Sequence, residues 1–100
     1  MLDSIIHQPV RLRIMSVLID LAPGDEVDFT HLKKVLGLTD GNLGAHLLKL
    51  EEAGYINVNK LFVDRKPRTY VRVSGAGRDA YGAHVRALRA IIESGENGKE

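Results

Sequence analysis

Two segments with helical periodicity meet across a very short connection near residue 38. Asp28 is a suitable N-cap for the first segment, and Gly37 suits the left-handed conformation that ends many helices. Thr39, only two positions later, is a suitable N-cap for a second segment that runs to about Ala53, with Gly54 as its stop. Two helices this close, joined through a glycine, predict a helix-turn-helix unit.

The flanking segments supply the other expected elements. Pro9 is suited to the first turn of a helix whose apolar residues recur up to Leu21, before Pro23-Gly24-Asp25 interrupts it. Beyond Gly54 the periodicity changes to about two, which predicts a hairpin with strands near 55–63 and 69–73 around a turn at 64–67. Ser74 then caps a last helix. The fold class expected is mainly α with a small β-hairpin, that is, α+β.

Composition narrows the class of protein. A chain of 100 residues is expected to form one domain, and 44% apolar residues argue against disorder. Without cysteine it has neither disulfides nor thiolate metal ligands. No apolar run reaches the roughly 18 residues of a spanning helix, and no signal-peptide pattern opens the chain, so we expect a cytoplasmic protein without a membrane partner.

The net charge of +1 hides a strong local asymmetry. Residues 60–72 carry a net charge of +4, whereas residues 20–52 carry −4. The basic charge is therefore concentrated on the predicted hairpin.

Three segments carry a resemblance to a known family. They are HQPVRLRIMSVL (7–18), LTDGNLGAHLLKLEEAGYI (38–56) and VDRKPRTYVRVSGAGR (63–78). Together with the order of elements, they make the chain similar to the small MarR/ArsR-like transcriptional regulators, which consist of little more than a winged helix-turn-helix domain. The resemblance implies one such domain over 1–94, a dimerisation helix at about 75–94 and a frayed tail at 95–100. The glycine-rich stretch 74–77 departs from the family and leaves the start of the last helix open.

The helix at 39–53 is the expected recognition helix. Leu43, Leu47 and Leu50 share one face and should point into the core. The remaining face is small and polar near the helix N-terminus, the end that recognition helices present to the major groove. The predicted DNA-contacting residues of this helix are Thr39, Gly41, Asn42, Ala45, His46 and Lys49. Asn42, His46 and Lys49 taken alone would also fit an ordinary solvated face.

The hairpin tip supplies the second set of candidates. Arg65, Lys66 and Arg68 surround a turn that Pro67 should stiffen, and a cationic tip suits the negative potential of a minor groove. Lysine and arginine also protect edge strands from aggregation, which is the ordinary alternative. The family resemblance points to Arg65 as the tip contact, and Asp64 is expected to orient the local arginines.

Other chemistry finds little support in the sequence. His7, His31, His46 and His84 are scattered singly, so we expect no metal and no cofactor. No nucleophile elbow, phosphate-binding glycine loop or paired-carboxylate pattern is present, and an enzyme is not expected.

The last helix has more apolar surface than a small domain needs. Its two adjoining apolar rows suggest that one packs inward and the other on a second copy; the alternative is that the first helix alone covers both rows. By analogy with the family, the N-terminal segment joins this interface. The predicted dimer residues are Leu2, Ile5, Ile6, Tyr81, Val85, Leu88, Ile91 and Ile92.

The sequence thus predicts a homodimeric, sequence-specific regulator that binds double-stranded DNA. The alternative is a winged-helix module for protein–protein interaction. The operator, the sign of regulation and any small-molecule effector are not encoded in a recognisable motif.

Overall fold

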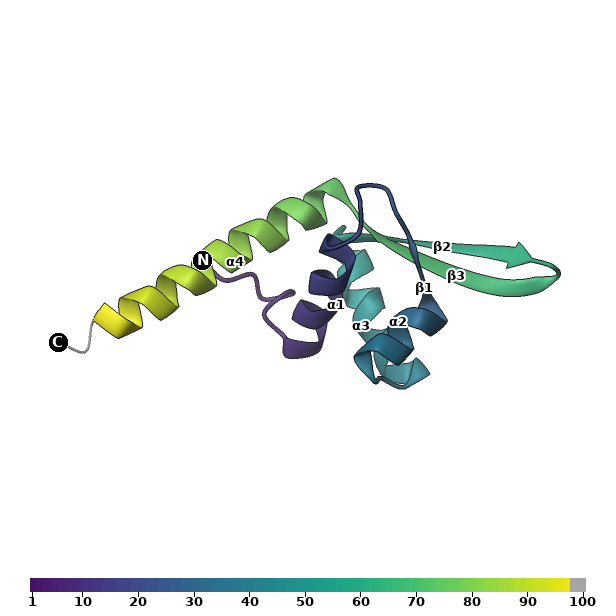
Figure 1. The fold of residues 1–100 in the computed structure, drawn as a ribbon, viewed down its shortest axis with the longest axis horizontal. Helices are drawn as coiled ribbons and strands as arrows, with labels where there is room; N and C mark the ends of the chain where they lie inside the picture. The colour runs from purple at the N-terminus through teal and green to yellow at the C-terminus, as the bar shows by residue number, and fades with distance from the viewer. Residues whose placement is uncertain (98–100) are drawn as a thin grey trace.

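Three helices form the body of the protein. The computed structural model describes residues 1–97, and in it α1 (Pro9–Ile19), α2 (Phe29–Leu36) and α3 (Asp40–Glu52) pack together (Figure 1). Pro9 lies in the first turn of α1, where its missing N–H breaks no helical bond. The Gln8 side chain accepts a hydrogen bond from the Arg11 backbone N–H at 2.9 Å and so caps the same helix.

The helix-turn-helix prediction is confirmed down to its caps. The Asp28 carboxylate accepts from the backbone N–H of Thr30 at 2.6 Å. Gly37 ends α2 in the left-handed region, with φ 67°, and the Thr39 hydroxyl accepts from the backbone N–H of Asn42 at 3.1 Å. Gly54, with φ 80°, follows the end of α3 as expected.

The hairpin consists of β2 (Ile56–Val63) and β3 (Lys66–Val73). Its turn is shorter than the predicted 64–67, because Asp64 and Arg65 alone form it, with φ values of 51° and 67°. Positive φ at both central residues matches a type I′ turn, whose twist suits a hairpin. Pro67 therefore stands in β3, opposite Phe62, in a pair that exchanges no ladder hydrogen bonds, so its missing N–H costs none.

A third strand was not predicted. β1 (Val27–Asp28) pairs antiparallel with β3, Val27 opposite Val71 and Asp28 opposite Tyr70, which gives the sheet order β1-β3-β2. Two residues are too few to show any periodicity, and this strand forms only because β3 is beside it. The fold is α+β, with four helices and a three-stranded antiparallel sheet in the described residues.

The last helix, α4 (Gly75–Asn97), begins where Ser74 was expected to cap it. The Ser74 hydroxyl accepts from the Gly77 N–H at 2.9 Å. A Cβ at Gly77 would lie 2.0 Å from the carbonyl oxygen of Tyr55, so this unusual glycine lets α4 approach the chain just before β2. The helix continues past residue 94 to Asn97, and the rest of the expected tail, 98–100, lies outside the described residues.

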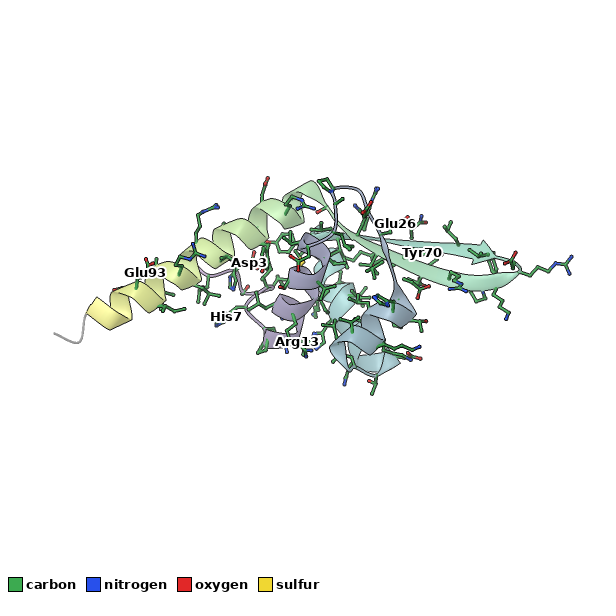
Figure 2. All side chains as sticks on the ribbon, viewed as in Figure 1. Asp3, His7, Arg13, Glu26, Tyr70 and Glu93 are labelled. Carbon is green, nitrogen blue, oxygen red and sulfur yellow. The ribbon has the colours of Figure 1, made fainter. Side chains whose placement is uncertain are left out.

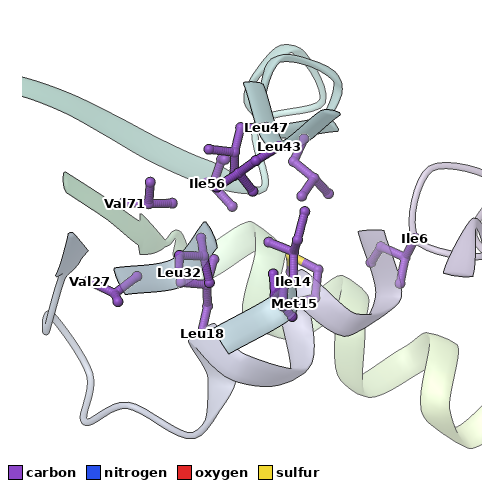
Figure 3. Packing of buried hydrophobic residues seen from close by; sticks show 12 residues of the cluster. Ile6, Ile14, Met15, Leu18, Val27, Leu32, Leu43, Leu47, Ile56 and Val71 are labelled. Carbon is purple, nitrogen blue, oxygen red and sulfur yellow. The ribbon is translucent and has the colours of Figure 1, made fainter. Parts of the chain in front are cut away.

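The core lies between the three-helix body, the sheet and the start of α4. Its buried residues come from the N-terminal segment, the three helices of the body and all three strands (Figure 3), and Ala80 and Tyr81 of α4 pack against them. The fully buried aliphatic side chains are Ile6, Ile14, Met15, Leu18, Leu32, Leu43, Leu50 and Val71. The sheet tip and the far end of α4 project in opposite directions, which stretches the molecule to 62 × 26 × 22 Å (Figure 1).

Candidate nucleic-acid interface

The exposed face of α3 is the one that the sequence singled out. Leu43, Leu47 and Leu50 are buried, as predicted. On the solvent side, Gly41, Asn42, Ala45 and Lys49 are exposed together, and Thr39 is exposed at the helix start. Lys33 of α2 forms a 2.8 Å ion pair with Asp40, which places a cation against the acidic first residue of this helix.

His46 lies apart from this group, on the flank that faces α1. It is half-buried, and its Nδ1 lies 3.3 Å from a guanidinium nitrogen of Arg11. Because arginine only donates, Nδ1 acts as the acceptor and the ring proton belongs on Nε2. Burial, followed by the charge of Arg11, lowers the pKa of His46.

Arg11 contacts the predicted site residue His46 and is not itself among the residues predicted from the sequence. Its Nε donates to the carbonyl oxygen of Ile5 at 2.5 Å, so one guanidinium joins the N-terminal segment to α3. No local pattern signals this role, because Arg11 and His46 are 35 positions apart.

The hairpin tip presents Arg65 and Lys66 to solvent. Arg65 sits in the second position of the type I′ turn, a left-handed conformation that glycine adopts more readily than arginine. Arg68 is also exposed but is held in place, since its guanidinium donates to the Asp28 carboxylate at 3.0 Å.

Asp28 takes the role that was expected of Asp64. In the part of the chain that the structure describes, the carboxylate within 4 Å of a hairpin arginine is that of Asp28. Partial burial alone would raise the pKa of Asp28, but the hydrogen bonds from Arg68 and the Thr30 and His31 amides outweigh it and lower the pKa. One carboxylate thus caps α2 and ties the hairpin to the helix-turn-helix unit.

A hollow of about 360 Å³ separates α3 from the hairpin. Gly44 and Leu48 line it from α3, while Val58, Lys60 and Thr69 line it from the sheet. Leu48 is 53% exposed at this place. Helix α3 and the hairpin therefore border the same hollow.

The N-terminal segment is fastened to α4 by a polar cluster. The Asp3 N–H donates to Nδ1 of the buried His84 at 3.0 Å, and the Asp3 carboxylate accepts from the Tyr55 hydroxyl and from the backbone N–H of Ile5. Asp3 and His7 lie beside α4 in Figure 2. The ring of His7 lies 5.6 Å from that of His84, but no group of three potential metal ligands occurs within the described residues.

Burial, followed by the charge of His7, lowers the pKa of His84. Burial alone would raise the pKa of Asp3, but the Tyr55 and backbone hydrogen bonds outweigh it and lower the pKa. His84 is thus a packed, neutral core residue, with Nδ1 as its acceptor.

The predicted dimer residues do not all lie on the surface. Ile6 is fully buried, so its side chain has no exposed area to offer a partner. The other N-terminal residues, Leu2 and Ile5, are half-buried. On α4, Tyr81, Val85 and Leu88 are half-buried, whereas Ile91 and Ile92 are 55% and 61% exposed. Helix α1 therefore does not cover both apolar rows.

None of the helices in residues 1–97 has the length and hydropathy needed to cross a bilayer.

Comparison with known proteins agrees with this geometry. A transcriptional regulator homologue from Pyrococcus horikoshii has a solved structure with TM-score 0.80 and 37% identity, covering 90% of this chain and 86% of that one. An uncharacterized protein of Methanocaldococcus jannaschii is 35% identical over 82% of this chain and 86% of its own length.

More distant structures share the fold. FabT of Streptococcus pneumoniae, solved in complex with DNA, has TM-score 0.58 and 24% identity, covering 87% of this chain and 60% of that one. A MarR-family regulator from Porphyromonas gingivalis also shares this fold, with TM-score 0.55 and 18% identity. The resemblance to winged helix-turn-helix regulators is confirmed by the family model and by the Pyrococcus horikoshii structure. The family model described as "Winged helix DNA-binding domain" matches residues 10–92, and the chain belongs to that family of winged-helix transcriptional regulators.

Proposed function

We propose that this protein is a sequence-specific regulator that binds double-stranded DNA, with α3 in the major groove and the hairpin tip near the adjacent minor groove. The observation that carries the proposal is a pair of features on neighbouring elements: the small, exposed face in the N-terminal half of α3 and the cationic type I′ tip of the hairpin, whose strands share a hollow with α3. The DNA complex of FabT supports this arrangement by fold analogy. Binding to DNA would place the protein in the cytoplasm, and the proposal assigns it no catalysis.

Each α3 residue has a role in the proposal. Asn42 pairs with an adenine edge, while Lys49 reaches a phosphate or a guanine. Thr39, Gly41 and Ala45 allow the helix backbone to approach the DNA closely. His46 acts at the flank through its Nε2–H, because Arg11 occupies its other nitrogen.

The hairpin residues divide by position. Arg65 at the turn enters the minor groove, and Lys66 beside it neutralises a phosphate. Arg68 is less available to DNA, because its guanidinium already pairs with the Asp28 carboxylate. To bind a phosphate, Arg68 has to leave that carboxylate or contact both groups at once.

A second copy completes the proposed regulator. The exposed apolar end of α4, with Leu2 and Ile5 beside it, forms the dimer interface. Two-fold symmetry then places two recognition helices on half-sites about 34 Å apart, one helical turn of DNA.

The experiment is a salt series of duplex binding measured by fluorescence anisotropy. We expect wild-type affinity for random duplex DNA to fall steeply with salt, with a slope of about −0.9 for each neutralised phosphate. Arg65→Gly removes the charge and suits the turn, so it should leave the fold intact and flatten the slope, by about 1 if Arg65 touches one phosphate and by less if it reads groove width.

Arg86→Ala is the matched control, because Arg86 is exposed on α4, the helix that projects away from the hairpin (Figure 1). It should leave both affinity and slope unchanged. Wild-type protein that shows no salt-dependent binding would refute the proposal and favour the protein-interaction module. Equal changes of affinity and slope in Arg65→Gly and Arg86→Ala would show that the hairpin tip does not contact DNA.

A further inference from the structure

The hairpin carries an aromatic side chain where solubility would favour a polar one. Phe62 is 79% exposed, and Pro67, a second apolar residue, stands opposite it in the sheet register. Both lie within a segment of strongly positive charge, next to Arg65 and Lys66. Exposed aromatic rings in such a setting commonly mark a binding surface.

Strand geometry fixes the face to which this pair belongs. Successive side chains alternate between the faces of a strand, and opposite residues in an antiparallel pair share a face. Phe62 and Pro67 therefore share the face of Lys60 and Thr69, the residues that line the hollow beside α3. Leu61, Val63, Lys66 and Arg68 lie on the opposite face. The apolar pair thus extends the surface next to the recognition helix toward the tip.

The distance between Phe62 and the hairpin tip determines which part of the DNA the Phe62 ring can contact. Phe62 and Pro67 form the second residue pair behind the turn, about 5–7 Å back at roughly 3.3 Å per residue. The minor groove is about 7.5 Å deep, so a turn that itself enters the groove as far as the base edges holds this pair at the rim of the groove. Phosphate and deoxyribose form that rim, and of these only the sugar offers an apolar surface.

We propose that Phe62, with Pro67 opposite it, packs on deoxyribose at the rim of the minor groove and supplies a part of the affinity that does not depend on salt. This inference rests on the proposed DNA-binding function. The neighbouring cations of the tip supply the charge complementarity that brings DNA, rather than another surface, to this ring. A second copy is the weaker candidate, because the apolar end of α4 projects away from the hairpin (Figure 1).

The test compares Phe62→Thr with Leu61→Thr. Threonine is a strong strand former, so both variants keep the hairpin, and Leu61 is the matched control on the opposite face, 43% exposed. Anisotropy with one duplex over a salt series measures affinity and slope together. We expect Phe62→Thr to weaken binding about tenfold at every salt concentration, with the wild-type slope unchanged, because no phosphate contact is lost. Leu61→Thr should stay within about twofold of wild type.

Each other result overturns the inference in a distinguishable way. Equal losses in both variants would indicate general damage to the hairpin, and a flattened slope would mean that Phe62 only positions a cation. Wild-type affinity in Phe62→Thr would show that the ring contacts no DNA. Altered sedimentation of Phe62→Thr would assign the ring to a protein contact. DNA bending can be measured by energy transfer between dyes at the two ends of the duplex. Bending by wild type that is lost in Phe62→Thr would indicate that the ring inserts between bases instead of packing on the sugar. Wild-type protein without DNA binding would refute the proposed function itself.

Discussion

Single residues join parts of this fold that are distant in sequence. Asp28 connects α2 to the hairpin through Arg68, and Arg11 connects the N-terminal segment to His46. His84 has the same role for α4, because its Nδ1 accepts from the Asp3 N–H across 81 positions. In His46 and His84 the connection requires a neutral imidazole.

This requirement predicts a pH dependence of stability. The folded pKa of His46 and of His84 is lowered, so in mild acid the unfolded chain binds protons that the folded chain does not. The free energy of unfolding should be highest above the ordinary histidine pKa of about 6.5, and it should fall as the pH drops from there toward the lowered values. Urea denaturation at a series of pH values measures this change.

Substitutions separate the contributions. His84→Gln keeps an acceptor for the Asp3 amide but does not titrate, so the acid-side loss should be smaller than in wild type. His31→Gln is the control, because His31 is exposed on α2. A wild-type pH profile in His84→Gln would show that His84 does not carry this dependence.

At the scale of elements, α3 combines poor helix formers with a well-formed helix. A Cβ built at Gly41 meets nothing within 4 Å, so the packing of the chain itself gives no reason for this glycine. We therefore expect Gly41→Ala to raise the free energy of unfolding by about 0.5–1 kcal/mol. If the α3 backbone approaches DNA, the same variant should lose about tenfold in affinity, the cost of a methyl group in a tightly packed contact.

Gly41→Ala is informative because stability should rise while DNA affinity falls. Urea denaturation measures the stability, and fluorescence anisotropy measures the affinity. Gly95→Ala is its control on α4, where the added Cβ also meets open space. It should leave DNA binding unchanged. Unaltered DNA affinity in Gly41→Ala would mean that the helix start stays clear of the duplex.

At the scale of the whole molecule, the dominant feature is its length. The Cα radius of gyration is 15.3 Å, against about 13 Å for an ordinary domain of this size. The hairpin and α4 account for the excess, since each projects beyond the three-helix body (Figure 1). Such projections suit contacts with DNA at one end and with a second copy at the other.

Ile92 is the residue best suited to a test of the proposed dimer interface on α4. It is 61% exposed, so Ile92→Glu costs the single chain little, yet it would place a charge without a counterion in an apolar interface. We expect wild type to sediment as a dimer at micromolar concentration and Ile92→Glu as a monomer with much weaker operator binding. Ala90→Glu, exposed on the opposite side of the helix, is the control and should remain dimeric. Wild-type monomers that protect a single asymmetric half-site would refute the paired-helix mechanism.

Local signals were sufficient for most of the fold. The helix-capping contacts of Asp28, Gly37, Thr39 and Ser74 reach backbone groups no more than four residues away, so these capping roles can be predicted from the sequence alone. Helical and strand periodicity likewise predicted the buried leucines of α3 and the hairpin, because burial of one face imposes a pattern on the chain.

The tertiary structure decided what depends on residues meeting across the fold. It added β1, which exists only beside β3, and it moved Pro67 from the turn into the strand, where its missing N–H is harmless. In the folded protein the His46 ring contacts Arg11, and Arg68 forms an ion pair with Asp28. Ile6 is buried in the core instead of lying at the surface. Gly77, which looked like a departure from the family, is required because α4 crosses the Tyr55 carbonyl at a distance that leaves no space for a side chain. Local preferences act over a few residues, whereas these contacts depend on how whole elements pack.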